Sequence, residues 1–218
     1  MIEAIVSTSR AVLLVGASDI GDNDLTISLT VASTVVAADG GADHVLARGL
    51  RPVAVIGDAD SLSPAAQAAF GEVLHPLADQ DTTDFEKALA RIDAPLIVAA
   101  GFLGGRLDHT LAVLNVMARR PDPPVVLVGA HDVVLKVPPA LRVAVPAGTR
   151  VGLMPLGPAR VTTTGLVWNL TDRNLAPDGA VSSSNRSADE VFTVAADGPL
   201  FLTLPQSCLH AALAALGH

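Results

Sequence analysis

Three acidic clusters, each at the end of an apolar run, hold the residues of this chain most suited to chemistry. They are Gly57-Asp58-Ala59-Asp60-Ser61, Asp79-Gln80-Asp81-Thr82-Thr83-Asp84-Phe85 and Gly104-Gly105-Arg106-Leu107-Asp108-His109. Carboxylates repel one another, so a fold that gathers several in one cleft loses stability unless a cation lies among them. The hard divalent cation suited to oxygen ligands beside a phosphate is Mg²⁺. The clusters therefore predict a Mg²⁺-dependent enzyme that moves a phosphoryl or pyrophosphoryl group.

The third cluster adds groups that suit a polyphosphate. Arg106 supplies a fork of hydrogen-bond donors, and Gly104 and Gly105 let the backbone approach a ligand closely. At the start of a helix this pattern favours a phosphate-binding nest, although the glycines also fit a plain tight turn. His109 is either a substrate contact or a packed side chain.

Each carboxylate also has a purely structural interpretation. Asp58 and Asp60 can both point at one cation, or they can form an Asx turn before the next helix. Asp84 fits a metal ligand or a favourable charge at a helix N-terminus. Asp108 fits a catalytic group or a helix N-cap. Each signal is weak alone, and together they favour the metal and phosphate interpretation.

Residue types exclude several other classes of site. The sequence has no G-x-x-x-x-G-K-[ST] segment, and its two lysines, Lys87 and Lys136, lie outside glycine loops, which excludes a P-loop NTPase. The six histidines show no paired ligand spacing, which argues against zinc. The net charge of −8 argues against nucleic acid as a partner. Cys208 lies away from the clusters, so a nucleophilic role is not expected.

Composition predicts a globular, cytoplasmic protein. The chain has 218 residues, half of them apolar, enough for one large or two modest domains. No apolar stretch approaches the roughly 18 residues of a membrane span, and the N-terminus shows no basic-then-apolar signal. A single cysteine excludes an internal disulfide and fits a reducing compartment.

Short apolar runs in the first 130 residues predict strands buried on both faces of a parallel sheet. The runs are Ala11–Val15, Val35–Ala38, Val53–Ile56, Leu96–Ala100 and Val125–Val128. Because helical patterns alternate with them, we predict an α/β domain with a doubly wound, mainly parallel sheet.

Three helix starts are visible between these runs. Ser63-Pro64 supplies an N-cap and a first-turn proline for a helix that ends near Phe70. Thr83 with Glu86 forms a capping box. A third helix begins near Asp108, and its apolar spacing predicts that it buries Leu111, Leu114 and Met117.

In doubly wound sheets the ligand lies beyond the carboxyl ends of the strands, and the candidate residues all fall there. Asp39-Gly40-Gly41 follows the run that ends at Ala38, and Asp58 and Asp60 follow the run that ends at Ile56. The segment 101–108 follows the next run in the same way, and Asp84 lies in the first turn of the helix after Thr83, beside a polar loop. We therefore expect four loops to converge on one rim.

After about residue 130 the helical pattern disappears, and short β-rich pieces separated by proline and glycine predict an antiparallel β-sandwich. The pieces are Val133–Val137, Leu141–Val145, Arg150–Met154, Arg160–Thr164, Leu166–Leu170, Ala180–Ser182, Glu190–Val194 and Leu200–Leu204. The predicted domains are residues 1–130 and 131–218. The tail from Cys208 to Leu216 fits one or two helical turns.

At these residues the chain resembles the thiamine pyrophosphokinase family. The family's motifs stand here, in the family's order, as Asp39–Ala42, Gly57–Ser61, Asp81–Asp84 and Gly104–His109. In the β domain, Thr164–Leu170 and Ser184-Asn185 resemble thiamine-contacting segments. The resemblance runs from about Val12 to Leu204. One departure is Ala59, where many members carry phenylalanine, and we expect it to alter local packing rather than metal binding.

The resemblance implies a homodimer that binds ATP and Mg²⁺ through residues 1–130 and thiamine through the β-sandwich at the subunit interface. By resemblance, the thiamine hydroxyl attacks the β-phosphorus of ATP and AMP leaves. Asp58, Asp60 and Asp84 are the expected metal ligands. Arg106 is expected to neutralise charge, and Asp108 to orient the nucleophile or take its proton. The set expected around ATP is Asp39, Gly40, Gly41, Gln80, Asp81, Thr83, Gly104, Gly105, Arg106 and His109.

The residues expected around thiamine are Leu166, Trp168, Ser184 and Asn185. Trp168 is the only tryptophan in a chain without tyrosine, and an indole face suits a cationic thiazolium by stacking and cation–π attraction. The alternative is a core tryptophan. Ser184 and Asn185 either bind the pyrimidine or close a turn.

Three other functions compete with this hypothesis. Asp58-x-Asp60 is similar to the motif of phosphatases with an aspartyl nucleophile, which need a later lysine, and neither lysine is expected to be well placed. Nucleotide-sugar transferases also use Asp-x-Asp but do not need the Gly-Gly-Arg-x-Asp-His segment. A non-catalytic sensor of thiamine or nucleotide would tolerate loss of the aspartates, which are all present here.

Overall fold

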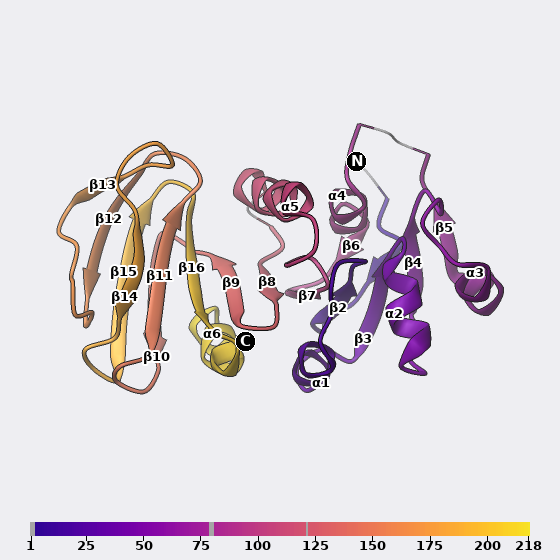
Figure 1. Cartoon of the computed structure of the whole chain (residues 1–218), viewed down its shortest axis with the longest axis horizontal. Coiled ribbons are helices and arrows are strands. Elements are labelled where there is room, and N and C mark those ends of the chain that lie inside the picture. The colour runs from indigo at the N-terminus through magenta and orange to yellow at the C-terminus, as the bar shows by residue number, and fades with distance from the viewer. Residues whose placement is uncertain (1–2, 79–80, 121) are drawn as a thin grey trace. The chain divides into compact units, whose positions relative to one another are not determined.

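The computed structural model describes residues 3–78, 81–120 and 122–218, and these form two compact units (Figure 1). The first unit runs through Val116 and includes Leu127–Ala130. The second comprises Met117–Val126 and His131–His218. The chain passes from the first unit to the second after Val116, returns to the first unit for Leu127–Ala130, and re-enters the second unit at His131.

The first unit is built on a parallel sheet whose strands pair in the order β7-β2-β3-β4-β5, with β8 next to β7. The strands are β2 (Val12–Val15), β3 (Thr34–Ala38), β4 (Ala54–Gly57), β5 (Leu74–Pro76), β7 (Ile97–Ala100) and β8 (Val125–Val128). β2, β4, β7 and β8 are buried at every position, as expected of strands covered on both faces. This confirms the predicted parallel α/β sheet.

Helices connect these strands, and two further short strands form a separate parallel pair. The helices are α1 (Asp22–Leu29), α2 (Gly41–Ala47), α3 (Pro64–Phe70), α4 (Asp84–Leu89) and α5 (Leu107–Arg119), with a 3₁₀ turn at Gly71–Val73 and the paired strands β1 (Val6–Ser7) and β6 (Ile92–Asp93). Two predicted caps are present. Ser63 Oγ accepts a hydrogen bond from Ala66 N at 3.1 Å, and Thr83 Oγ1 accepts one from Glu86 N at 3.3 Å.

Of the three residues predicted to be buried on α5, only Met117 is buried, Leu114 is half-buried, and the prediction for Leu111 is wrong. Leu111 is 55% exposed, whereas Val113, Val116 and Met117 are buried. Leu107 and Leu111, four residues apart, share an exposed face of the helix. The sequence offered two apolar stripes on one helix, and only tertiary contacts select the one that packs.

Gly41, expected at the nucleotide site, has a packing role at the start of α2. A Cβ added there would lie 2.1 Å from the carbonyl oxygen of Val15, so backbone would have to move. We expect Gly41→Ala to lower the free energy of unfolding by about 2–4 kcal/mol in urea denaturation. Gly71→Ala is the control, because a Cβ added at Gly71 would have no neighbouring atom within 4 Å and its φ is −54°. A Gly41→Ala protein as stable as the Gly71→Ala protein would contradict this packing role.

The second unit contains two antiparallel groups of strands, in the orders β14-β11-β16-β9 and β10-β15-β12-β13 (Figure 1). The strands are β9 (Asp132–Lys136), β10 (Ala140–Ala144), β11 (Arg150–Pro155), β12 (Ala159–Thr164), β13 (Arg173–Leu175), β14 (Ser182–Arg186), β15 (Val191–Asp197) and β16 (Leu200–Pro205). β10 and β12 alternate buried and exposed residues, so each presents one apolar face to the interior. This confirms the predicted β-sandwich.

The predicted strand Leu166–Leu170 is wrong. The chain turns at Gly165, whose φ is +73°, and only Leu166 makes a bridge, to Ser187. Asn169 Oδ1 then accepts the backbone N–H of Leu166 at 3.1 Å, which closes the loop on itself. The segment therefore projects as a loop instead of pairing in a sheet.

The tail forms a 3₁₀ turn at Gln206–Cys208 followed by helix α6 (Leu209–Ala215), as predicted. Cys208 is buried, and burial raises the pKa of its thiol. A buried thiol with a raised pKa is a poor nucleophile, in agreement with the sequence-based expectation. Across the described residues, no helix combines the length and apolar character needed to cross a membrane.

Candidate active site

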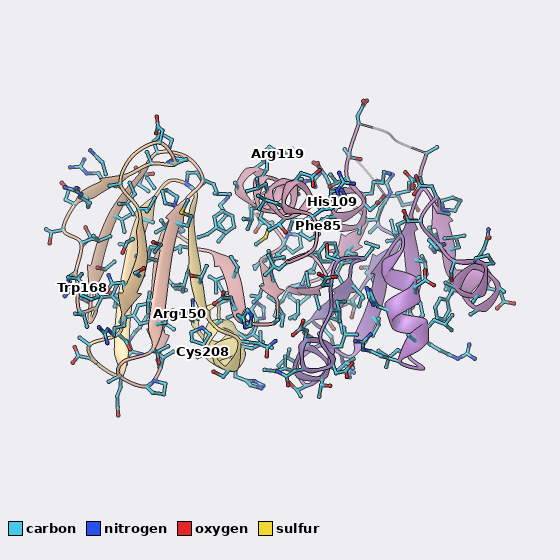
Figure 2. The ribbon with its side chains drawn as sticks, in the orientation of Figure 1. Phe85, His109, Arg119, Arg150, Trp168 and Cys208 are labelled. Atoms are coloured by element: carbon cyan, nitrogen blue, oxygen red, sulfur yellow. The ribbon has the colours of Figure 1, made fainter. Side chains whose placement is uncertain are left out.

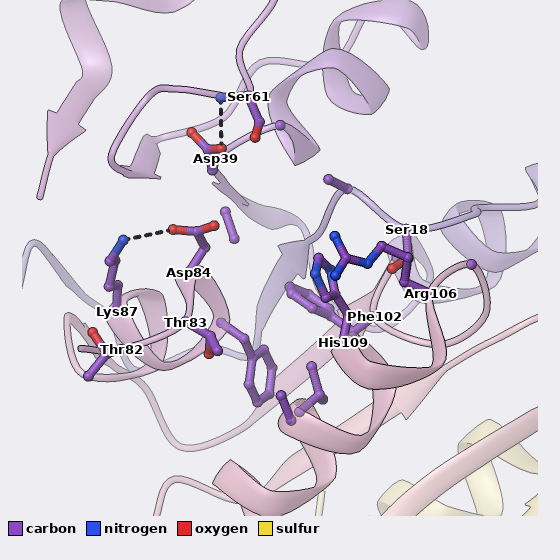
Figure 3. A pocket seen from close by; sticks show the side chains of 18 of the residues that line it. Ser18, Asp39, Ser61, Thr82, Thr83, Asp84, Lys87, Phe102, Arg106 and His109 are labelled. Atoms are coloured by element: carbon purple, nitrogen blue, oxygen red, sulfur yellow. Dashed lines mark hydrogen bonds and ion pairs between the residues drawn. The ribbon is translucent and has the colours of Figure 1, made fainter. Parts of the chain in front are cut away.

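One pocket of about 560 Å³ opens at the carboxyl ends of the parallel strands of the first unit (Figure 3). Residues that follow β2, β3, β4 and β7 all line it, as the strand-end rule predicts. Its volume is in the range of small-molecule sites. The candidate residues that line it are Asp39, Gly40, Asp58, Thr83, Asp84, Gly105, Arg106 and His109.

Three carboxylates in this region converge closely enough to hold one metal ion. Asp39, Asp58 and Asp60 each offer an oxygen, and these oxygens lie within 4.8 Å of one another. Asp39 is only 2% exposed; its Oδ2 accepts the backbone N–H of Ser61 at 3.2 Å, and its Oδ1 has no hydrogen-bond partner among the described residues. A buried acceptor left in this way costs free energy unless a cation satisfies it.

The backbone under this cluster is strained. Asp39 has a φ of +41° and Ala59 a φ of +66°, conformations that non-glycine residues rarely adopt. Ala59 separates Asp58 from Asp60, so the left-handed turn decides where both carboxylates point. Gly57 completes the arrangement, because an added Cβ would lie 2.6 Å from Asp39 Cβ. Strain gathered at three carboxylates is typical of a functional site.

Lys87 is the main residue that the sequence-based interpretation missed. Its side chain is 4% exposed, and its Nζ donates to Asp58 Oδ2 at 3.0 Å. The same Nζ donates to Asp84 Oδ1 at 3.1 Å, the contact drawn in Figure 3. The expectation that neither lysine is well placed was therefore wrong. The available signal was the spacing, since Lys87 lies three residues after Asp84 and shares its helix face.

The ammonium of Lys87 acts to lower the pKa values of the carboxylates that it contacts, and they act to raise its own. Its hydrogen bond to Asp58 holds the pKa of that carboxyl below its usual value. Burial raises the pKa of Asp84, and its hydrogen bond with Lys87 offsets this only in part. Burial alone would lower the pKa of Lys87, but its hydrogen bonds to the two carboxylates outweigh burial and raise it. Lys87 is therefore protonated at neutral pH.

Asp84 contacts Lys87 and is not one of the three carboxylates that converge. Its role as a metal ligand stays a prediction. Asp81 does not line the pocket, and neither do Asp60, Gly41, Gly104 and Asp108. Gln80 lies outside the described residues.

The glycine–arginine segment before α5 has a left-handed backbone at both glycines. Gly104 and Gly105 have φ values of +87° and +60°. Arg106 donates to both oxygens of Asp108, at 3.1 and 2.6 Å, which raises the pKa of the guanidinium and lowers the pKa of the carboxyl. Both side chains are exposed, and Asp108 lies in the first turn of α5 rather than before it. This position does not fit the N-cap alternative.

The opposite part of the pocket is apolar. The rings of Phe85 and Phe102 have centroids 4.7 Å apart, and Ala112 and Val113 lie beside them in the lining. Ser18 also lines the pocket and was not predicted. The strand-end rule, applied to the loop after Val12–Val15, would have found it.

In the second unit, Trp168 is 55% exposed, which excludes the core alternative (Figure 2). Arg186 lies 5.7 Å from its ring centroid. Asn185, 4% exposed, accepts the N–H of Trp168 at 3.2 Å and donates to its carbonyl oxygen at 2.7 Å. Leu166 is buried and Ser184 is exposed. Asn185 therefore holds the Trp168 loop, and its amide has little capacity left for a ligand.

Comparison with known proteins assigns a family to both units. The chain matches the family model described as the catalytic domain of thiamin pyrophosphokinase over residues 26–127. It matches the model described as the vitamin B1 binding domain of the same proteins over residues 134–201.

Curated relatives carry the same name. The chain is 30% identical over 210 residues to thiamine pyrophosphokinase 3 of Oryza sativa subsp. japonica, covering 79% of each sequence. It is 34% identical over 142 residues to thiamine pyrophosphokinase 2 of Arabidopsis thaliana, covering 58% of this chain. That alignment spans about half of the Arabidopsis protein, 53% of its length.

Solved structures have the same fold. Thiamin pyrophosphokinase from Candida albicans superposes with a TM-score of 0.78 at 17% identity, covering 92% of this chain and 93% of that one. The thiamin pyrophosphokinase of Geobacillus thermodenitrificans gives a TM-score of 0.76 at 25% identity, covering 92% and 99%.

Proposed function

The chain belongs to the thiamin pyrophosphokinase family, and from this premise we propose that it transfers the pyrophosphoryl group of ATP to the hydroxyl of thiamine, giving thiamine diphosphate and AMP. One observation carries the proposal at the level of chemistry. Oxygens of Asp39, Asp58 and Asp60 lie within 4.8 Å of one another at the edge of a pocket that Gly105 and Arg106 also line. Phosphoryl transfer needs a bound cation and hydrogen-bond donors to the phosphates, and this site offers carboxylates for the first and Arg106 for the second.

These carboxylates fit Mg²⁺. The donor set is all oxygen, which this ion prefers, and the buried Asp39 Oδ1 needs a partner that no described residue provides. We assign Mg²⁺ to Asp39, Asp58 and Asp60, with Asp84 linked to them through Lys87. When bound, the ion would neutralise charge on the phosphates of ATP.

The remaining groups of the pocket position ATP. Arg106 and the backbone N–H groups of Gly104 and Gly105 would receive phosphate oxygens and stabilise charge that develops during transfer. Because Arg106 is now paired with Asp108, phosphate binding would compete with that ion pair. Asp108, once released, would orient the thiamine hydroxyl or take its proton. The apolar part beside Phe85 and Phe102 suits a flat base.

We assign thiamine to the exposed Trp168 loop and propose that the protein works as a homodimer. Trp168, Val167 and Val181 are exposed apolar side chains of the second unit, and a second copy would cover such a surface. The single, buried cysteine fits a reducing compartment, and we place the activity in the cytoplasm.

Trp168→Ala is expected to raise the KM for thiamine at least about tenfold while changing the KM for ATP less than about twofold. The indole face supplies stacking and cation–π attraction to thiamine alone, and each is a contribution of about 1–2 kcal/mol. Steady-state kinetics with each substrate varied in turn would measure both constants. Phenylalanine would retain the stacking in part, so the KM of Trp168→Phe for thiamine should lie between those of the wild type and Trp168→Ala. Equal rises in both KM values would exclude the stacking role.

The reaction itself is tested by incubating the protein with ATP, Mg²⁺ and thiamine and separating the products. AMP and thiamine diphosphate, formed in equal amounts, are expected. The contact between Lys87 and Asp58 keeps one alternative, a phosphatase with an aspartyl nucleophile. That alternative predicts free phosphate, without AMP, and independent of thiamine.

A further inference from the structure

Lys87 is a buried positive charge inside the acidic cluster. Asp39, Asp58, Asp60 and Asp84 bring four carboxylates to one region, and Lys87 contacts two of them at 3.0 and 3.1 Å. Its side chain is 4% exposed, while that of Asp58 is 17% exposed. Asp39 is 2% exposed, so its charge and those of Asp58 and Lys87 are poorly screened by water, and repulsion between Asp39 and Asp58 is costly without a cation.

Asp58 belongs to both arrangements. It offers an oxygen to the group that could hold a metal, and its Oδ2 also accepts from the ammonium of Lys87. Lys87 therefore contacts a carboxylate that could also bind the metal ion. Two cations so close to each other compete for the same negative charge.

We propose that Lys87 is the resident counter-cation of this cluster, which stabilises the assembled carboxylates before the divalent ion arrives and weakens the ion's binding. The inference rests on the proposed metal site. It makes Lys87 a positioning residue that acts through Asp58 and Asp84, and it gives a prediction of unusual sign. Removing the ammonium should destabilise the metal-free protein and at the same time tighten divalent-cation binding.

The test compares Lys87→Met with the wild type in the absence of nucleotide and thiamine. Methionine keeps most of the apolar stem and removes only the charge. Binding of Mn²⁺, followed by its electron paramagnetic resonance signal, is expected to tighten at least about tenfold, because a unit charge within a few ångströms of the ion is removed. The melting temperature in EDTA is expected to fall by about 5 °C or more and to recover with saturating Mn²⁺.

Lys136→Met is the matched control. It removes the chain's other lysine, whose Nζ donates to the carbonyl oxygen of Ala118 in the second unit, and it changes the net charge by the same amount. Its Mn²⁺ affinity should equal that of the wild type. Tightening of the same size in both variants would overturn the proposal, because it would reflect net charge alone.

A double variant keeps the test decisive if Lys87→Met does not fold. Lys87→Met with Asp84→Asn removes one positive and one negative charge, and it should melt in EDTA within about 2 °C of the wild type. A double variant as unstable as the single one would trace the loss to packing and overturn the proposal. Unchanged or weaker Mn²⁺ binding by Lys87→Met would do the same. If the wild type binds no Mn²⁺, the metal assignment itself fails, which is a distinct result.

Discussion

Asp60→Asn is expected to lower kcat at least about a hundredfold, with the fold intact. Asp60 is exposed and contributes an oxygen to the converging group, so its replacement removes a metal ligand without opening a cavity in the core. Loss of charge stabilisation at the transferring phosphate costs roughly two to three powers of ten in rate. Turnover measured by AMP release, together with circular dichroism and thermal melting, would separate the chemical effect from unfolding.

Asp178→Asn is the control for Asp60→Asn, because it neutralises an exposed carboxylate of the second unit. It should keep its rate within about twofold of the wild type. A near-normal rate for Asp60→Asn at saturating Mg²⁺ would refute its assignment as a ligand. Asp84→Asn, assayed alongside, tests whether Asp84 also supports metal binding. We expect a loss of the same size, because Asp84 is joined to Asp58 by Lys87.

Arg106→Ala is expected to lower kcat by about two powers of ten, the second largest effect. The fork donors of Arg106 belong to the glycine–arginine segment 104–106, where phosphate charge would develop during transfer. Arg106→Lys keeps the positive charge but loses the planar fork, so its rate should lie between those of wild type and alanine variant. Steady-state kinetics at saturating ATP and thiamine would measure these rates.

Arg150→Ala is the matched control for Arg106→Ala. Arg150 is also an exposed arginine paired with an aspartate, Asp132, at 2.6 Å, but it belongs to the β-sandwich unit. Its loss should leave kcat unchanged within about twofold, as for most surface ion pairs. If both arginine variants lost activity equally, the effect would not be specific to the glycine–arginine segment. Asp108→Asn, which frees Arg106 from its partner, would show whether Asp108 acts on the nucleophile or only holds the guanidinium.

Local patterns in the sequence were enough to predict most elements and the edge at which the site forms. Apolar runs such as Val125–Val128 became strands with the predicted bounds, and Ser63-Pro64 opened a helix as expected. These features depend on neighbours a few residues apart, so local patterns are enough to predict them. The prediction failed where a segment's composition fits one conformation and its flanking residues favour another. Leu166–Leu170 has a strand-like composition, yet Gly165 and Asn169 turn it into a loop.

The sequence by itself determined which residues could carry chemistry, because residue types and their place after strands do not depend on long-range packing. It identified Asp39, Asp58, Asp60 and Asp84 as neighbours at one rim. The tertiary structure alone decided how these charges pair. Distances of 3.0 and 3.1 Å put Lys87 between Asp58 and Asp84, and left-handed backbone at Asp39 and Ala59 aims the other oxygens together. Electrostatic energy varies with separation and burial over a few ångströms, and spacing along a chain does not encode either quantity.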